Sequence, residues 1–344
     1  MNAPGNSETA AALDALLAAA GVTKQKSLIR HIVESGIGMG QDQASRLNLK
    51  ITASALEEMR AAFRLFAPYV GTRKATIFGS ARTLQGEPLS DAAEQVARAF
   101  ADDDWMIVTG AGPGIMEAAA TGAGPEQSLG VSIRLPFEEK PNVIIAKDEH
   151  HVAMKYFFTR KLMLVKESSA FICLPGGFGT MDETFELLTL QQTGKMVPVP
   201  IVLLDRPGGT YWEGFRRFVV DEIETGGFAT PGDLERVLIT SSVDEAVSHV
   251  RRFWSNYQDL RWFDETLVLY LRNAPTELEL AQLNARFAPM VREGAIELTG
   301  PLPEEGDERP ELARVKLVLL PRAVGELHRL IWALDGLESA TGAE

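Results

Sequence analysis

Two neighbouring carboxylates follow a glycine-rich segment near the middle of this 344-residue chain. Residues 175–180 read PGGFGT, and Asp182 and Glu183 come directly after Met181. Glycines allow an anion to approach the backbone closely, and free N–H groups at the start of a helix attract phosphate. A carboxylate beside such an anion site is costly to keep ionised, which indicates a chemical task. It can serve as a general base or stabilise a developing cation.

The elements on either side of the glycines must position this site. Residues 170–174 form a short apolar run typical of a strand covered on both faces, and a helical pattern opens at Thr180. A strand, a glycine turn and a helix in that order place backbone N–H groups at the positive end of the helix dipole. We expect the phosphate to be held by the backbone of Gly176, Gly177, Gly179 and Thr180.

A purely structural interpretation of the same residues is also open. Thr180 and Glu183 have the Thr-x-x-Glu spacing of a helix capping box, in which Glu183 would only accept a bond from a backbone N–H. Ser242 and Glu245 show the same spacing without glycines before it. The glycine turn that precedes Thr180 favours the functional interpretation.

Strand and helix patterns alternate along the middle of the chain, which predicts a Rossmann-like, doubly wound parallel α/β sheet. In such sheets ligands bind at the carboxyl ends of the strands, near a switch in strand order. Strand patterns cover residues 75–78, 105–109, 129–133, 143–145, 170–174, 201–204 and 236–239. Helical patterns between and after them cover residues 91–103, 115–122, 151–166, 211–224 and 243–257.

Two further glycine turns are expected at the same edge of the sheet. One contains Gly79 and Ser80 after the first strand, and the other contains Gly112 and Gly114 after the second. Glu117 follows one turn into the next helix, where it can bind a base or ribose or only complement the helix dipole. The convergence of these turns predicts one nucleotide pocket. Neither GxGxxG nor GxxxxGK[ST] occurs, so NAD and P-loop nucleotide binding are not expected.

Arg160 and Lys161 form a basic pair upstream of the glycine-rich segment. If the helix starts at residue 151, Arg160 lies about 13 Å along its axis, at about 1.5 Å per residue, and misses the strand ends. It reaches the site only if residues 148–156 are partly irregular or the site lies across a subunit contact. Lys161 can bind phosphate or be solvated. His150 and His151 are adjacent and share no helix face, so no metal site is expected.

Residues 175–183, PGGFGTMDE, resemble the PGGxGTxxE motif of the LOG ("lonely guy") family, and Arg160 with Lys161 resembles its upstream Arg-Lys pair. The resemblance covers about residues 74–252, and the chain looks like the longer bacterial branch labelled "lysine decarboxylase". It implies a phosphoribohydrolase that releases the base from nucleoside 5′-monophosphates, including cytokinin precursors. It also implies a homodimer or larger homo-oligomer. Plant-type members often carry Met-His before the arginine, where this chain has aromatic residues.

The hypothesis for the reaction combines the glycine turn, Glu183 and Arg160. The glycine turn holds the 5′-phosphate while the ribose gains oxocarbenium character as the N-glycosidic bond breaks. Glu183 would stabilise that cation or activate the attacking water. Arg160, placed in the site by the family resemblance, would stabilise negative charge on the departing base. The hypothesis requires no metal or redox cofactor.

Composition and charge argue against several other functions and locations for this chain. The net charge of −13 argues against coating a nucleic-acid polymer or a membrane surface, which needs a basic face. Cys173 is the single cysteine, so an internal disulfide framework is excluded and a cytoplasmic location is expected. No apolar run is long enough for a transmembrane helix. Cys173 itself is expected to be a small buried residue.

We expect three parts in the chain. Residues 1–70 form an N-terminal helical extension, residues 71–258 the Rossmann-like catalytic domain, and residues 259–344 a small α+β domain with the order β-α-β-β-α. Three other functions remain open. The chain could be a non-catalytic nucleotide or molybdenum-cofactor carrier, which resembles this fold. It could be a pyridoxal-phosphate decarboxylase, although no lysine is marked for that task. The C-terminal part could sense a small molecule.

Overall fold

The computed structural model describes residues 7–134, 142, 144–145, 148–230, 232–305 and 309–341. The chain divides into two compact units, Met1–Glu57 and Glu58–Glu344. In the described part of the first unit, α1 (Ser7–Ala19) buries Leu13 and Leu17, which are four residues apart on one face. It is followed by α2 (Lys26–Gln41) and by the first part of α3 (Arg46–Phe66).

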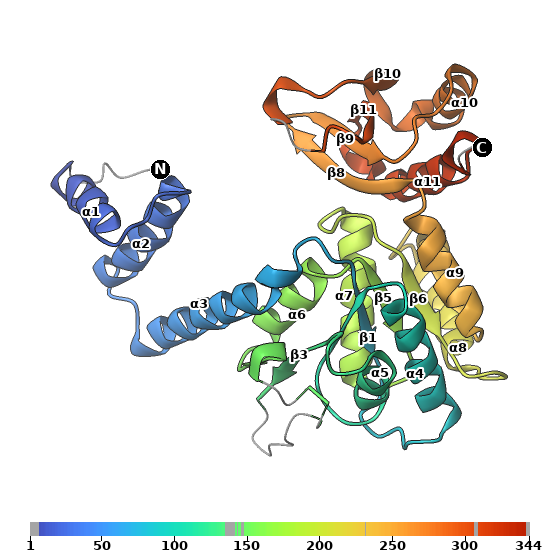
Figure 1. Ribbon diagram of the computed structural model, residues 1–344, viewed down its shortest axis with the longest axis horizontal. Coiled ribbons are helices and arrows are strands. Elements are labelled where there is room, and N and C mark those ends of the chain that lie inside the picture. The colour runs from blue at the N-terminus through green and yellow to red at the C-terminus, as the bar shows by residue number, and fades with distance from the viewer. Residues whose placement is uncertain are drawn as a thin grey trace. The chain divides into compact units, whose positions relative to one another are not determined.

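The second unit is built around a parallel sheet with the strand order β4-β3-β2-β1-β5-β6-β7 across its described residues (Figure 1). This confirms the predicted doubly wound α/β fold. The order reverses between β1 and β5, so the switch point lies at the carboxyl ends of these neighbouring strands. The strands are β1 (Lys74–Phe78), β2 (Met106–Thr109), β3 (Ser128–Ile133), β4 (His151–Met154), β5 (Ala170–Cys173), β6 (Ile201–Leu204) and β7 (Val237–Thr240).

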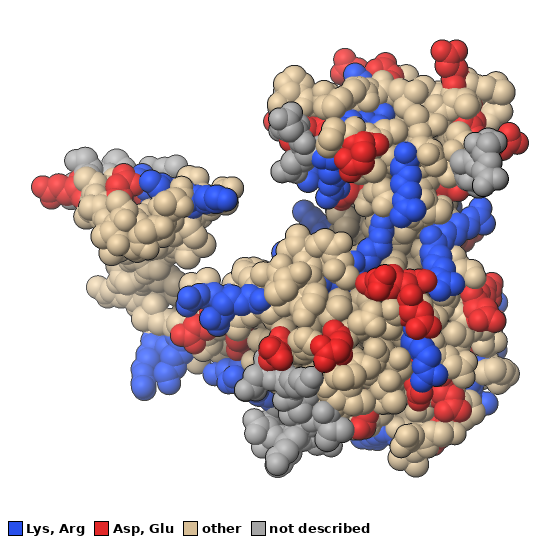
Figure 2. Space-filling model, viewed as in Figure 1, with Lys and Arg blue, Asp and Glu red and all other residues tan. Residues whose placement is uncertain are grey.

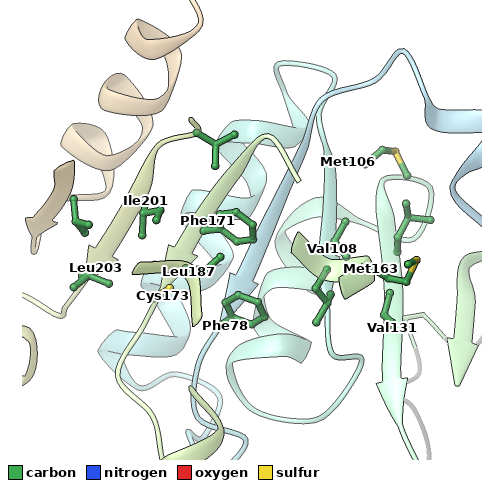
Figure 3. Packing of buried hydrophobic residues seen from close by; sticks show 14 of the residues in the cluster. Phe78, Met106, Val108, Val131, Met163, Phe171, Cys173, Leu187, Ile201 and Leu203 are labelled. Atoms are coloured by element: carbon green, nitrogen blue, oxygen red, sulfur yellow. The ribbon is translucent and has the colours of Figure 1, made fainter. Parts of the chain in front are cut away.

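Helices cover both faces of this sheet, because successive strand residues point to opposite sides. Phe78, Phe171 and Cys173 pack with α6 and α7 on one face, where the rings of Phe78 and Phe171 stack (Figure 3). Ile77 and Ile172 pack with α4, α5 and α9 on the other face. The helices are α4 (Pro88–Ala101), α5 (Ile115–Ala123), α6 (Phe157–Lys166), α7 (Phe178–Thr193), α8 (Tyr211–Phe218) and α9 (Val243–Phe253).

Two sequence predictions near β4 are wrong. Ile144 and Ile145 lie in a turn rather than in a strand, and residue 143 lies outside the described residues. The helix predicted over residues 151–166 is instead strand β4 followed by α6, which begins at Phe157. Residues 151–154 alternate between half-buried and buried along β3, the period-2 pattern of an edge strand. A four-residue strand just before a helix is too short for its sequence pattern to be distinguished from that of the helix.

A smaller antiparallel sheet with the order β10-β11-β9-β8 follows in the described C-terminal residues, as the predicted α+β appendix requires. The sequence analysis missed β8, because it extended the helix of residues 243–257 through the strand's first residue; α9 ends at Phe253. The helices and strands of this C-terminal part are β8 (Tyr257–Phe263), β9 (Thr266–Leu271), α10 (Glu277–Phe287), β10 (Val291–Thr299), β11 (Ala313–Leu319) and α11 (Val324–Asp335). None of the helices in the described part of the chain has the length and hydropathy needed to cross a bilayer.

Candidate active site

A pocket of about 870 Å³ lies at the carboxyl ends of β1, β2 and β5, beside the switch point of the sheet. All three predicted glycine turns contribute to its lining. The predicted site residues among the lining residues are Gly79, Ser80, Gly112, Arg160, Gly176, Gly177, Gly179, Thr180 and Glu183.

The start of α7 presents unpaired backbone N–H groups to this pocket. Gly177 is the N-cap residue and has no side-chain cap, and its carbonyl accepts the first helical bond from the N–H of Met181 at 3.1 Å. The N–H groups of Gly177, Phe178, Gly179 and Thr180 therefore have no carbonyl one turn back. Together with the helix dipole they form a site suited to phosphate.

The capping-box interpretation of Thr180 and Glu183 is wrong for this helix. Thr180 lies inside α7, whose N-cap is Gly177, so its hydroxyl does not cap the helix. The same spacing does cap α9, where the N–H of Glu245 donates to Oγ of Ser242 at 3.2 Å. Glu183 is therefore left without a capping task.

Two hydrogen bonds fix the peptide planes of the glycine turn. The carbonyl of Pro175 accepts from the N–H of Ser80 at 3.2 Å, and the carbonyl of Gly176 accepts from the hydroxyl of Tyr211 at 2.8 Å. Because the N–H of a trans peptide points opposite to its C=O, the turn offers donors rather than acceptors to an anion. Tyr211 is itself held by Asp205, whose Oδ2 accepts the N–H of Tyr211 at 2.9 Å.

Arg160 and Glu183 lie side by side at the pocket. Nη1 of Arg160 is 3.4 Å from Oε1 of Glu183, and their side chains are only 10% and 13% exposed. α6 begins at Phe157 rather than at residue 151, so Arg160 lies only one turn from the helix start. The segment before α6 is not helical, which was one of the two expected alternatives, and Arg160 can therefore reach the ends of the strands. Its Nε donates to the carbonyl of Val131 at 3.0 Å. A Cβ on Gly110 would lie 2.3 Å from Nη2 of Arg160, so a side chain there would displace the guanidinium.

Burial raises the pKa of Glu183 to about 7, although the positive charge of Arg160 opposes the shift. The carboxylates of Asp182 and Glu186 raise this pKa further, and Lys161 lowers it. Glu183 is therefore poised to exchange a proton near neutral pH, which is the property expected of a general acid or base.

Three predicted residues are not among those that line the pocket. Lys161 forms ion pairs with Asp182 at 2.8 Å and Glu186 at 3.0 Å. Gly114 lets the second glycine turn pack on the first, since a Cβ there would lie 2.4 Å from the carbonyl oxygen of Ser80. Glu117 is half-buried on α5.

The two adjacent histidines have separate partners. Nε2 of His150 is 3.1 Å from the hydroxyl of Tyr69, and Nε2 of His151 is 2.8 Å from Oγ of Ser132. Their rings are thus engaged with different elements rather than with one another.

The sequence analysis missed several lining residues that carry no motif. Ser132 lies in β3, and Tyr211 opens α8 after β6. Phe157 and Phe178 are the first residues of α6 and α7, and they are 53% and 96% exposed. Only Phe178, which lies within the glycine-rich segment, had a sequence signal; the others have neither a charge nor a spacing rule that could have identified them.

The fold and this pocket define a Rossmann-like α/β protein in which the start of a helix adjoins a carboxylate–guanidinium pair. Residues 114–250 match the family model described as "Possible lysine decarboxylase". A cytokinin riboside 5′-monophosphate phosphoribohydrolase of Mycobacterium tuberculosis is 28% identical over 169 residues, which cover 46% of this chain and 83% of that protein. The enzyme of the same name from Rhodococcoides fascians is 28% identical over 185 residues, which cover 52% of this chain and 89% of that protein.

These matches confirm the predicted resemblance to the LOG family over the Rossmann-like part of the chain. Among solved structures, the molybdenum cofactor binding protein of Rippkaea orientalis is 22% identical with a TM-score of 0.36, covering 52% of this chain and 96% of that one. A likeness at this score carries no argument about function.

Proposed function

We propose that this protein hydrolyses the N-glycosidic bond of nucleoside 5′-monophosphates and releases the free base and ribose 5-phosphate. The observation that carries the proposal is the contact between Glu183 and Arg160 at a pocket that also contains the unpaired N–H groups of α7. The names of the similar proteins from Mycobacterium tuberculosis and Rhodococcoides fascians support this class of substrate.

In the proposed complex the 5′-phosphate binds the backbone N–H groups at the start of α7. Gly176, Gly177 and Gly179 have no side chain to obstruct it, and a Cβ on Gly177 or Gly179 would meet no protein atom within 4 Å. The space beside Gly177 and Gly179 is thus free for a ligand, whereas a Cβ on Gly176 would lie 2.2 Å from Oγ1 of Thr180. Binding energy from the phosphate would hold the ribose in position for the reaction.

Hydrolysis forms one bond and breaks another at C1′ of the ribose. The oxygen of water bonds to C1′, and the electron pair of the C1′–N bond leaves with the base. Ionised Glu183 accepts the proton of the water and stabilises the oxocarbenium character of the sugar. Arg160 stabilises negative charge on the base until the base nitrogen takes up a proton.

We also propose a homodimer or larger homo-oligomer, as the family resemblance implies, and a cytoplasmic location, as the single cysteine indicates. The proposal also assigns catalysis to residues 71–258, flanked by residues 1–70 and 259–344. The preferred base is open, and AMP is the first substrate to test.

The test is to incubate the purified protein with nucleoside 5′-monophosphates and with the matching nucleosides, and to separate the products by chromatography. We expect free base from the monophosphates alone, and at least about 10²-fold slower release from the Glu183→Gln variant. Tight nucleotide binding without release of base would instead support the carrier function and overturn the proposal. Equal release from nucleosides would contradict the phosphate site at α7.

A further inference from the structure

A second concave region lies between α11 and its neighbours, away from the pocket of Glu183. It consists of two adjoining hollows of about 200 and 320 Å³, which share Arg286, Trp332 and Ala333. We call it the arginine cleft. Figure 2 shows Lys and Arg side chains on the visible face over the region where Figure 1 draws α9 and α11. The charged residues that line the arginine cleft are Glu235, Arg236, Arg252, Glu279, Arg286 and Arg329.

The arginine cleft carries positive charge that nearby carboxylates do not fully neutralise. Arg236 pairs with Asp233 at 2.8 Å, and Arg329 pairs with Glu235 at 3.1 Å. Glu279 is engaged in the capping box of α10, with Thr276 as its partner.

Arg252 and Arg286, in contrast, are exposed. Neither has a carboxylate within ion-pair distance among the residues that the structure describes. Two guanidinium groups without an ion-pair partner in one hollow favour an anionic ligand.

A buried histidine and an aromatic ring also line the arginine cleft. His328 is only 2% exposed, and its Nε2 has no hydrogen-bond partner in the described part of the chain. Burial lowers the pKa of His328 to about 3, and the charge of Arg236 lowers it further. The imidazole is therefore neutral and adds no positive charge to the arginine cleft. The guanidinium of Arg252 lies over the indole of Trp332, with Cζ of Arg252 5.7 Å from the centre of the ring.

We propose that the arginine cleft binds a small phosphorylated molecule through Arg252 and Arg286, at a site separate from the pocket of Glu183. A guanidinium group can donate two parallel hydrogen bonds to phosphate oxygens, and two such groups suit a dianionic phosphate. The binding does not depend on the proposed hydrolysis, because no residue of the arginine cleft lines the pocket of Glu183.

The test is calorimetric titration of the full chain with inorganic pyrophosphate, which carries the phosphate groups without a base or ribose. Pyrophosphate can also bind the start of α7, so the unaltered chain should show two sites. The Arg252→Gln/Arg286→Gln double variant should weaken pyrophosphate binding at one of them by at least about tenfold, as expected from loss of two charge-assisted contacts. An Arg160→Gln variant, altered in the other pocket, should keep this binding. The affinity should fall as salt is added.

Arg251→Gln is the matched control, because Arg251 is the exposed neighbour of Arg252 and pairs with Asp103 outside the arginine cleft. It should bind pyrophosphate like the unaltered chain. Equal affinity of the double variant and the Arg251→Gln control would overturn the proposal. The same titration with AMP, carried out in the Glu183→Gln background so that AMP is not consumed, distinguishes a nucleotide from a simple phosphate as the preferred ligand.

Discussion

At the scale of single residues, Glu183 carries the largest chemical consequence. The Glu183→Gln variant keeps the size and polarity of the side chain but cannot accept a proton or carry negative charge. We expect kcat for nucleoside 5′-monophosphate hydrolysis to fall by about 10²- to 10⁴-fold, the usual contribution of general acid–base catalysis. KM should change little, because the phosphate is held by the backbone of α7. A variant with near-normal kcat would contradict the assignment of Glu183.

Asp182 tunes the protonation of Glu183, and this effect can be measured. The negative charge of Asp182 raises the pKa of Glu183, so the Asp182→Asn variant should lower that pKa below about 7. If ionised Glu183 is the active form, the acidic limb of the kcat/KM profile should move to lower pH. Asp221→Asn, an exposed carboxylate in the segment after α8, is the control and should leave the limb in place. An unmoved limb in Asp182→Asn would argue that another group controls the pH dependence.

Gly110 makes room for the guanidinium of Arg160. In the Gly110→Ala variant the new methyl group would lie 2.3 Å from Nη2 of Arg160 and would push the flexible end of that side chain aside. We expect a loss of activity of at least about tenfold with little change in stability, because a small misplacement in an active site is costly. Gly214→Ala, which meets no atom within 4 Å, should be active. Normal activity of Gly110→Ala would show that the position of Arg160 is not critical.

At the scale of secondary-structure elements, the sequence predicted the glycine turns well and the segment before Arg160 poorly. A buried strand, several glycines and a helical pattern each leave a local signal around residues 170–190. The strand β4 has only four residues and borders α6 closely, so its period-2 pattern is lost in the helical pattern that follows. The contact between Arg160 and Glu183 depends on that boundary and on the pairing of distant strands, which no local pattern records.

Tyr211 illustrates an element that acts at a distance in sequence. It opens α8, yet its hydroxyl holds the carbonyl of Gly176 in the turn before α7. The Tyr211→Phe variant should allow that peptide to rotate and should raise KM for monophosphates about 3- to 10-fold, the value of one hydrogen bond. The inhibition constant of inorganic phosphate should rise by the same factor.

The matched control for Tyr211→Phe is Tyr69→Phe, which removes a hydroxyl that contacts His150 outside the pocket. It should leave both constants unchanged. A fall in kcat of Tyr211→Phe with unchanged KM and unchanged phosphate inhibition would mean that Tyr211 does not position the phosphate site.

At the scale of the whole molecule, alternation of strands and helices was sufficient to predict the parallel sheet except for β4, because its other strands are short apolar runs. The start of the C-terminal sheet was not predictable in this way. Strand β8 continues almost directly from α9, and its first residues are held by Asp335, which is 78 residues away from Tyr257 along the chain. Only the folded chain brings these residues together.

Asp335 joins α11 to the start of β8, and its protonation should affect the stability of the chain. Its Oδ1 accepts the N–H groups of Asn256 at 2.9 Å and Tyr257 at 2.8 Å, while its buried Oδ2 has no partner in the described part of the chain. Burial raises the pKa of Asp335 to about 7, against an ordinary value of 3.8. Between these values the unfolded chain has lost a proton that the folded chain keeps, so the free energy of unfolding falls as pH rises.

The Asp335→Asn variant retains an oxygen that can accept both N–H groups but removes the titration. The unaltered chain should therefore lose about 1–3 kcal/mol relative to this variant between pH 4 and pH 8, measured by urea unfolding of the full chain. Glu183 also has a raised pKa, but it is present in both proteins and cancels in the comparison. Asp264→Asn, in the exposed turn between β8 and β9, is the control and should parallel the unaltered chain at every pH. If the curves of Asp335→Asn and the unaltered chain are also parallel, Asp335 is ionised in the folded protein and the buried join between α11 and β8 is not sensitive to pH.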